Sequence, residues 1–271
     1  MAFKINKMGN LIYLTIPSFT DTGMVRHCFT TRQGGVSQGL YAALNTSPYK
    51  EEPIETTNKN LDIICRAIGI DYKNLVMTDQ THSDNIKVVD EGFLYEKDYS
   101  NRELIGYDAL ITNLPHIPLI TFYADCVPIY LLDPVNRAIG LVHSGWKGTT
   151  LHIGQKTLEK MRIHYGTRPE HCLAAIGPSI EKDCFEIGED TAEIFKQSFK
   201  DYHDIIFPKD NGKYLVDLWN VNMQMLIRTG VKQENITESK MCTKCNAELL
   251  YSYRRDKGQS GSLSAIMELN Y

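Results

Sequence analysis

Two apolar runs separated by a turn constrain the fold of this chain more than any other feature. The runs are Val127–Leu132 and Ala138–Val142, and the tetrapeptide Asp133–Asn136 (DPVN) lies between them. Asp at the first position and Pro at the second are typical of a type I turn. The segment therefore predicts a β-hairpin.

The ends of this hairpin carry two potential metal ligands. If Asp133 and Asn136 flank a two-residue loop, Cys126 and His143 face each other across the two strands. Facing Cβ atoms lie about 4.5–5.5 Å apart. A zinc ion bound at about 2.3 Å to sulfur and about 2.0 Å to nitrogen can bridge such a pair. A bulge at Asn136 would shift this register by one residue.

A third potential ligand is His82, in "TDQTHSDN", just after the strand-like run Leu75–Thr78. Two His and one Cys leave one position of a tetrahedral zinc site open, which is typical of catalytic zinc. The pair Cys126 and His143 also permits a thiolate nucleophile with a histidine base. His82 near this pair favours a metal, whereas Asn or Asp orienting His143 favours a cysteine hydrolase. The spacing is also compatible with an ordinary core Cys and hydrogen-bonded His residues, and it leaves these alternatives open.

Two Gly-containing segments are candidates for anion binding. In "TTRQGGVS", Arg32 could offer its guanidinium, and Gly34 and Gly35 their backbone N–H groups, to phosphate or ribose oxygens. In "HSGWKG", Lys147 lies at the expected start of a helix, whose free N–H groups suit phosphate. Both patterns are also typical of ordinary turns.

The segment "CTKC", Cys242–Cys245, looks like half of a zinc ribbon. The sequence contains no second CxxC to complete four ligands, so we interpret these residues as two incidental thiols. Arg254 and Arg255 follow in a Gly-containing loop, which either binds an anion or forms a solvated turn.

Composition narrows the possible partners and compartments. The 271 residues are 42% apolar and carry a net charge of −4, with no stretch that concentrates Lys and Arg, so we expect no nucleic-acid partner. The most apolar segment, Ile117–Leu132, contains Asp125 and is short for a membrane span, so we expect no membrane partner either. Seven cysteines without a disulfide-like spacing indicate free thiols in a reducing cytoplasm.

The pattern along the chain predicts the α+β class, with residues 1–271 forming a single domain of short hairpins mixed with helices. No repeat or linker divides the chain. We predict strands at Leu11–Ile16, Leu75–Thr78, Ile86–Val89, Ala109–Thr112, Leu119–Tyr123, Val127–Leu132, Ala138–Val142 and Leu173–Ile176. We predict helices at Asn58–Ile68, Leu151–Tyr165, Asp190–Phe199 and Leu218–Thr229, of which all but the third end at a glycine.

Seven segments together resemble one known family, in the order found there. They are "FTTRQGGVS", "DQTHSDN", "DALIT", "ADCVPIYLLDP", "GLVHSGWKGT", "AAIGPSIEKDCFEIG" and "CTKCNAELLYSYRRD". The chain resembles the laccase-domain, or polyphenol oxidase, family from about Arg26 to about Leu269. The resemblance implies packed mixed β-sheets flanked by helices, an architecture similar to that of certain bacterial toxin cysteine hydrolases.

The same resemblance implies a site and an activity. His82, Cys126 and His143 match the metal ligands of the family, which implies bound Zn²⁺, with Cu²⁺ possible. The implied substrates are purine nucleosides and phosphate. The implied reactions are phosphorolysis of adenosine, inosine, guanosine and methylthioadenosine, and deamination of adenosine. The chain departs from the family pattern at Ser144 and Lys147, where Ala and Arg are usual, and at Ser260-Gly261-Ser262, where Thr-Gly-Arg is usual.

These residues lead to specific expectations about chemistry. We expect Asp125 to be the general acid or base, because it adjoins the ligand Cys126. We expect Asp125 and Asp84 to accept hydrogen bonds from the second ring nitrogens of the His ligands. Multicopper oxidation is not expected, since three ligands cannot assemble a cluster of several coppers. The alternatives are a hydrolase or amidase for cell-wall precursors with Cys126 as nucleophile, a copper-binding oxidase, and a non-catalytic metal-binding module.

Overall fold

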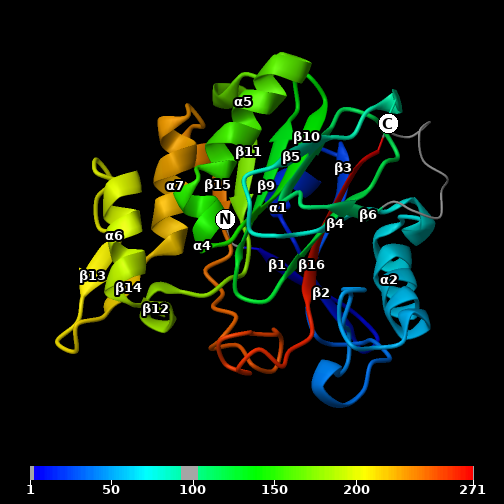
Figure 1. Ribbon diagram of the computed structural model, residues 1–271. Coiled ribbons are helices and arrows are strands. Elements are labelled where there is room, and N and C mark those ends of the chain that lie inside the picture. Colours follow the sequence, from blue (N-terminus) through cyan, green and yellow to red (C-terminus); the bar gives the residue numbers. More distant parts are fainter. Residues whose placement is uncertain (1–2, 93–102, 271) are drawn as a thin grey trace.

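Two large β-sheets packed face to face form the centre of the molecule (Figure 1). The computed structural model describes residues 3–92 and 103–270. The first sheet has seven strands, in the order β1 (Lys4–Met8), β2 (Leu11–Thr15), β3 (Val25–Thr30), β16 (Leu263–Leu269), β8 (Leu119–Tyr123), β4 (Val76–Asp79) and β6 (Glu103–Ile105).

The second sheet has six strands and mixes parallel with antiparallel pairs. Its order is β15 (Ile236–Glu238), β11 (Leu173–Ile176), β9 (Val127–Asp133), β10 (Ala138–Ser144), β7 (Ala109–Thr112) and β5 (Ile86–Val88). A small sheet contains β12 (Glu186–Ile187), β14 (Tyr214–Val216) and β13 (Ile206–Pro208).

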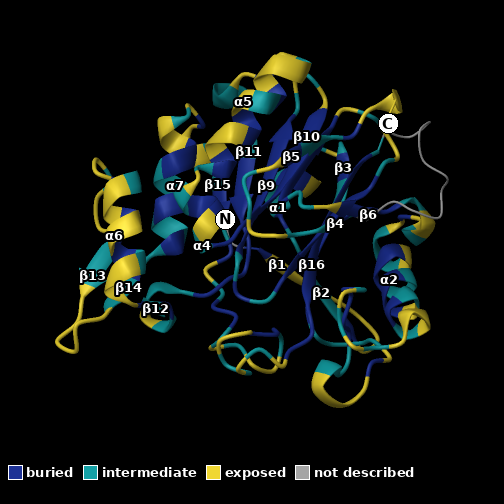
Figure 2. Ribbon diagram, viewed as in Figure 1, coloured by how far each residue is buried: buried dark blue, intermediate teal, exposed yellow. Residues whose placement is uncertain are grey.

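Helices cover the outer faces of both large sheets, which gives four layers (Figures 1 and 2). The helix α2 lies against the seven-stranded sheet, and α5 and α7 lie against the six-stranded sheet. The helices are α1 (Pro17–Thr20), α2 (Ile54–Ile68), α4 (Trp146–Thr150), α5 (Ile153–Tyr165), α6 (Glu189–Ser198) and α7 (Leu218–Arg228). Short 3₁₀ turns are η1 (Gly39–Tyr41), η2 (Tyr72–Asn74), η3 (Pro169–His171), η4 (Lys182–Cys184) and η5 (Gln233–Asn235).

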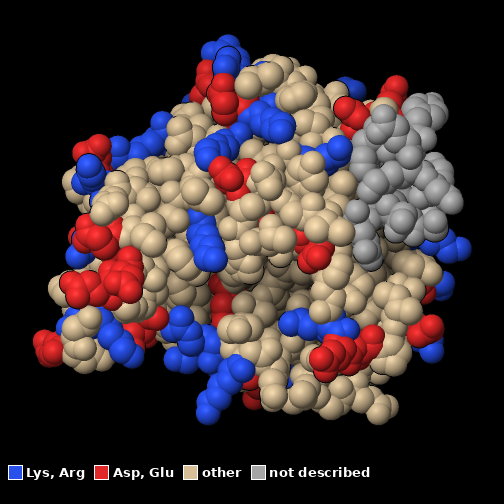
Figure 3. Space-filling view, in the orientation of Figure 1, with Lys and Arg blue, Asp and Glu red and all other residues tan. Residues whose placement is uncertain are grey.

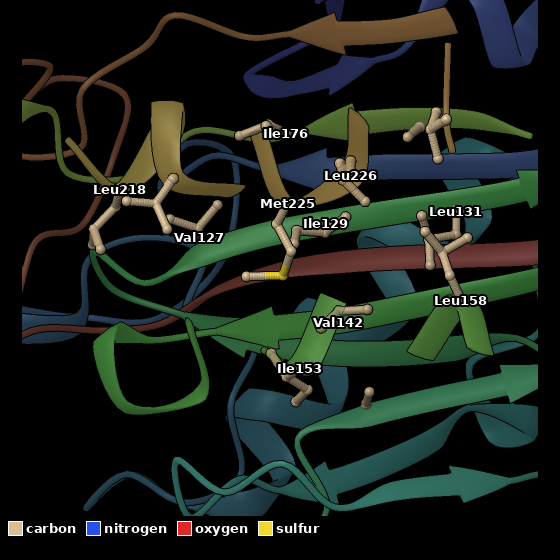
Figure 4. Close-up of a cluster of buried hydrophobic side chains, with 14 of the residues drawn as sticks. Val127, Ile129, Leu131, Val142, Ile153, Leu158, Ile176, Leu218, Met225 and Leu226 are labelled. Atoms are coloured by element: carbon tan, nitrogen blue, oxygen red, sulfur yellow. The ribbon is translucent and has the colours of Figure 1, made fainter. Parts of the chain in front are cut away.

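Strand β9 shows why the sequence forms these layers. Alternate residues of a strand point to opposite faces. Ile129 and Leu131 accordingly pack beneath α5 and α7, whereas Tyr130 and Leu132 pack between the two sheets. Figure 4 shows the helix-facing cluster, where Met225 of α7 lies next to Ile129. A strand buried on both faces must be apolar throughout, which explains the continuous run in the sequence.

The predicted hairpin forms, but its predicted register is wrong. Ala138 pairs with Asp133, and His143 therefore lies opposite Pro128 and not opposite Cys126. The loop has four residues because the Asp133 side chain accepts hydrogen bonds from two backbone N–H groups of the turn, and Arg137 adopts a left-handed conformation (φ 53°). Cys126 consequently lies just before β9, outside the paired strands.

The other predicted elements are confirmed, with small differences at their ends. All eight predicted strands and all four predicted helices form. The helix α2 begins at Ile54, four residues before its predicted start, and α6 is capped by Gly188 and not by Asp190. The apolar pattern did not predict β3 and β16, two central strands of the seven-stranded sheet. Within residues 3–92 and 103–270, no helix has the length and apolar character needed to cross a membrane.

The buried imidazole of His27 predicts a pH-dependent loss of stability. His27 lies on β3, its Nε2 accepts a hydrogen bond from the backbone N–H of Ile16 at 2.8 Å, and burial lowers its pKa to about 4. In the unfolded chain the imidazole pKa is near 6.5. The neutral ring therefore stabilises the fold fully above about pH 6.5, and this contribution is lost as the pH falls from about 6.5 to about 4. We expect a loss on the order of 3 kcal/mol in the free energy of unfolding.

Urea unfolding at neutral pH and near pH 4 measures this loss in the wild-type chain and in His27→Gln, whose amide oxygen can also accept the Ile16 N–H. The variant should lose less stability on acidification than the wild type. His164→Gln, at an exposed position, is the control and should follow the wild type. Equal pH dependence in His27→Gln and the wild type would contradict the prediction.

Candidate metal centre and its pocket

Three strand ends bring His82, Cys126 and His143 together. His82 follows β4, Cys126 lies in the turn between β8 and β9, and His143 is near the end of β10. Their ligand atoms all lie within 4.8 Å of one another, and His82 Nε2 is 3.8 Å from Cys126 Sγ. The three residues thus meet although the predicted hairpin register is wrong. The turn directs Cys126 toward the two histidines because Asp125, immediately before it, has a positive φ of 92°.

The carboxylate of Asp108 organises both histidines. One oxygen accepts from His143 Nδ1 at 2.7 Å and from the His82 backbone N–H at 3.0 Å. The other accepts from the backbone N–H groups of Thr81 and Ser83 and from the Ser83 hydroxyl. The backbone carbonyl of Asp108 also accepts from the His143 N–H at 2.7 Å. Asp108 is completely buried, and its hydrogen bond to the His143 ring is buried with it and therefore shielded from water.

The predicted acceptors for the histidine rings are wrong in the case of His143. Its acceptor is Asp108, and the expected residues have other partners: Asp84 forms an ion pair with Lys156, and Asp125 bonds to a loop described below. Nearness in the sequence did not predict the acceptor, because Asp108 lies just before β7, the strand that pairs with β10. The motif "DALIT" contained this residue, but its carboxylate had no assigned role.

Asp108 also fixes which nitrogen of His143 faces the cluster. An ionised carboxylate only accepts hydrogen bonds, so His143 Nδ1 carries the hydrogen and Nε2 is left to face Cys126. Burial raises the pKa of the Cys126 thiol, but the charge and hydrogen bond of His143, together with His82, outweigh burial and lower it to about 6. Burial likewise lowers the pKa of His143, but Cys126 and Asp108 raise it to about 9. The thiol is therefore prepared to act as a thiolate, the form that binds metals.

The donor set fits a zinc or copper ion. Thiolate and imidazole are ligands that both metals accept. The orienting carboxylate on His143 is the arrangement usual around a histidine that binds zinc.

Gly145 supplies the space that the three ligands need. A Cβ atom at this position would lie 2.8 Å from His82 Cδ2 and 3.1 Å from Cys126 Sγ, closer than side chains tolerate. Gly145 is also the N-cap of α4, with extended backbone angles that other residues adopt freely. Glycine is therefore required here by the close approach of the ligands and not by the backbone conformation.

A pocket of about 580 Å³ opens above the cluster and is lined by His82, Cys126 and His143. This volume is typical of sites for small molecules. Lys50 and Arg254 also line it, and Figure 3 shows a hollow near the centre of the viewed face with Lys and Arg side chains at its lower rim. The aromatic lining of the pocket was not predicted from the sequence. It consists of Tyr49, Phe122, Tyr123, Trp146, Phe185 and Tyr253.

Asp125 lines the pocket, but both of its oxygens are engaged. Oδ1 accepts from the Thr243 hydroxyl at 2.6 Å, and Oδ2 accepts from the Arg254 backbone N–H at 2.7 Å. Asp125 thereby joins the loop that follows β15 to the turn carrying Cys126. Its role as general acid or base stays a prediction.

The structure does not bring the "TTRQGGVS" segment into this pocket. The Arg32 guanidinium donates to the carbonyls of Ala42 and Ala247 and stacks on Tyr251. A Cβ at Gly34 or Gly35 would meet backbone atoms at 2.3 and 2.4 Å, so both glycines are required by close packing. Arg32, Gly34 and Gly35 therefore have structural roles in this loop. Their role in phosphate binding stays a prediction.

The segment after His143 also differs from expectation. The helix α4 has only five residues, and Lys147 is exposed, with its Nζ 5.7 Å from the Trp146 ring centre. Lys147 is not among the residues that line the pocket, whereas Trp146 is. Ser144 is buried and hydrogen-bonded to Asn222 at 2.8 Å, so it holds α7 against the end of β10.

Comparison with known proteins agrees with this geometry. The chain matches the family described as "Multi-copper polyphenol oxidoreductase laccase" over residues 26–270. The chain belongs to this family. It is similar to the protein of Bacteroides thetaiotaomicron named purine nucleoside phosphorylase, at 34% identity over 258 residues that cover 94% of each chain. It is also similar to a protein of an unknown prokaryotic organism named adenosine deaminase RL5, at 35% identity over 231 residues that cover 84% of this chain and 87% of the other.

The fold of the family is likewise confirmed. The crystal structure of the Bacillus licheniformis hypothetical protein YfiH matches with a TM-score of 0.87 and 30% identity, over 98% of this chain and 99% of the other. The predicted α+β class, with mixed sheets flanked by helices in a single domain, is therefore correct.

The close approach at Gly145 predicts that Gly145→Ala loses its metal while the fold persists. The added methyl group must displace His82 or Cys126, since both lie within about 3.1 Å of it. We expect metal content after purification to fall by about one equivalent per chain relative to the wild type, as measured by elemental analysis, with an unchanged circular dichroism spectrum.

Gly188→Ala is the matched control, because Gly188 is also an extended N-cap glycine but has open space around its Cβ position. It should keep full metal content. Normal metal content in Gly145→Ala would show that the ligands do not meet as described.

Proposed function

We propose that the chain is a zinc-dependent purine nucleoside phosphorylase that also deaminates adenosine. The observation that carries this proposal is the cluster of His82, Cys126 and His143 in the wall of a pocket of about 580 Å³. The names of the similar proteins, purine nucleoside phosphorylase and adenosine deaminase, support the same class of substrate. The proposed partners are therefore purine nucleosides and phosphate.

The lining of the pocket suits a nucleoside. Aromatic rings such as Phe122 and Tyr253 provide flat apolar surfaces for a purine. Lys50 and Arg254 supply positive charge for phosphate. These two cations, which the structure places in the pocket, are better phosphate candidates than Arg32 and Lys147.

The two reactions make different demands on these residues. In phosphorolysis, a phosphate oxygen bonds to C1′ while the bond from C1′ to the purine nitrogen breaks, and the leaving base takes up a proton. In deamination, water adds to the purine C6 and ammonia leaves. Zinc held by His82, Cys126 and His143 would supply a Lewis acid next to the bound substrate. The chain itself would hold the phosphate and the base, and Asp108 would keep His143 oriented.

A thiol hydrolase is the second candidate, because Asp108 orients His143 beside Cys126. This is the arrangement of a Cys–His–Asp triad. The position of His82 favours the metal, since its Nε2 is only 3.8 Å from Cys126 Sγ and a hydrolase has no need of it there.

A multicopper oxidase is not supported, despite the description of the family. Such enzymes need several coppers with many His ligands. Among the residues that the structure describes, the groups able to hold a metal contain only two histidines, His82 and His143.

The test begins with protein purified without added metal. Elemental analysis, followed by assays of inosine with phosphate and of adenosine alone, should show zinc together with hypoxanthine and inosine formation. Cys126→Ala should lose one equivalent of zinc and both activities, because a ligand is removed. Chelator treatment of the wild type should abolish turnover, and added zinc should restore it.

The outcomes separate the candidates. Turnover that survives complete removal of metal but is lost on alkylation of Cys126 would establish the thiol hydrolase instead. A Cys126→Ala protein that keeps the zinc content and the activity of the wild type would refute the ligand assignment. Zinc binding without turnover of any purine nucleoside would overturn the proposed substrate class.

A further inference from the structure

A second group of metal-ligating side chains lies next to the pocket and has no part in the cluster described above. It consists of Glu181, Cys184, Cys242 and Cys245, whose ligand atoms all lie within 4.8 Å of one another. Cys245 Sγ is 3.4 Å from Cys184 Sγ and 3.2 Å from Glu181 Oε1. Cys184 Sγ is 3.7 Å from the same Glu181 oxygen. Side chains 61 residues apart in the sequence therefore converge here.

Two turns of equal spacing supply these four ligands. "EKDC" and "CTKC" each place their ligands three residues apart, one turn at η4 and the other in the loop that follows β15 (Figure 1). The turns are tied together by backbone pairing, since Cys242 forms a β-bridge with Ser179 and the Thr243 N–H donates to the Ser179 carbonyl at 3.1 Å. The missing half of the zinc-ribbon pattern is thus an ExxC segment, which a search for CxxC alone cannot find.

The geometry fits a closed tetrahedral site. Sulfurs bound at about 2.3 Å to one zinc ion lie about 3.8 Å apart, and a carboxylate oxygen at about 2.0 Å lies about 3.5 Å from each sulfur. The distances of 3.2 to 3.7 Å among Glu181, Cys184 and Cys245 are close to these values. Four protein ligands leave no open position, which is typical of structural zinc and unlike the three-ligand cluster.

The environment also suits a structural metal. Cys242 is buried and Cys245 is exposed, so the group lies where an ion can enter from solvent and still be enclosed on one side. Lys244, between Cys242 and Cys245, brings positive charge close to Cys184, in a group that would carry three thiolates and a carboxylate.

We propose that Glu181, Cys184, Cys242 and Cys245 bind a second, structural zinc ion. The ion would join the turn at η4 to the loop that follows β15. Both segments form part of the pocket wall, through Phe185 from the first and Arg254 from the second. The Arg254 guanidinium already donates to the Cys184 carbonyl at 3.3 Å, and the ion would fix this contact further. Binding displaces the thiol protons, so affinity should fall in acid.

The test uses the Cys126→Ala chain, in which the proposed site is the only group of three or more clustered ligands left among residues 3–92 and 103–270. Cobalt(II) added to this metal-free protein should give the near-ultraviolet absorption of thiolate bound to cobalt, at one equivalent per chain. Adding Cys245→Ser to this chain should abolish the band, and Lys244→Ala in the same turn is the control that should keep it. Glu181→Gln should weaken cobalt binding at least tenfold, whereas Asp183→Asn, at an exposed neighbouring residue, should not.

A second measurement separates loss of metal from loss of fold. Zinc should raise the thermal unfolding midpoint of Cys126→Ala and leave the midpoint of Cys126→Ala/Cys245→Ser unchanged, while both proteins have equal midpoints without metal. Mass spectrometry distinguishes a disulfide from a metal site. A metal-free protein whose mass is lower by two hydrogens, because Cys184 and Cys245 form a disulfide, would overturn the proposal in favour of a redox pair. Failure of the Cys126→Ala chain to bind cobalt or zinc at this group would overturn it outright. Neither result depends on turnover of a nucleoside, so the two proposals stand or fall separately.

Discussion

The buried carboxylate of Asp108 is the interaction on which the candidate site depends. It lies immediately before β7 of the six-stranded sheet and accepts hydrogen bonds from residues 81–83, which follow β4 of the seven-stranded sheet. One side chain therefore joins the two sheets at the edge where the ligands meet. It also orients the ring of His143 through Nδ1 and holds the backbone of His82, which has a positive φ of 61°. Without this acceptor, the buried ring N–H of His143 and the backbone N–H groups of residues 81–83 would lose their partners at once.

The four-layer fold determines why a site forms at this edge. The strands β4, β8 and β10 all end near the same place, and each is followed by a segment that lines the pocket. The interior of the sheets is mostly apolar, and the three residues lie at its edge: His82 and Cys126 in turns beyond strand ends, and His143 one residue before the end of β10. Gly145 then allows the three ligands to approach one another more closely than any larger residue would permit. The second group of thiols holds a neighbouring part of the same wall.

The sequence predicted most of the elements and three residues that the structure brings together, but not the contacts between distant segments. Continuous apolar runs predicted β9 and β10 because a strand buried on both faces must be apolar. The predicted register of this hairpin is wrong because the side chain of Asp133 closes a longer loop. That loop depends on a local hydrogen bond and not on the pattern of apolar residues. Asp108 and Glu181 were missed for one reason: each acts on residues far away in the sequence, and a single carboxylate has no distinguishing pattern. The cation Lys50 reaches the pocket from a loop that is held by hydrogen bonds to a distant segment, such as those from Thr46 to the Ser262 carbonyl.

The affinity of the His82–Cys126–His143 cluster for zinc in Asp108→Asn tests this account most directly. The measurement is competition with a chromophoric chelator in a Cys245→Ser background, so that the second group of thiols does not contribute. Asp84→Asn is the control, since Asp84 lies in the turn that carries His82 but forms an ion pair with Lys156. An amide cannot accept all the hydrogen bonds that the carboxylate of Asp108 receives, so we predict an affinity about 10- to 100-fold below that of the control. Equal affinities in Asp108→Asn and Asp84→Asn would contradict the claim that Asp108 organises the site.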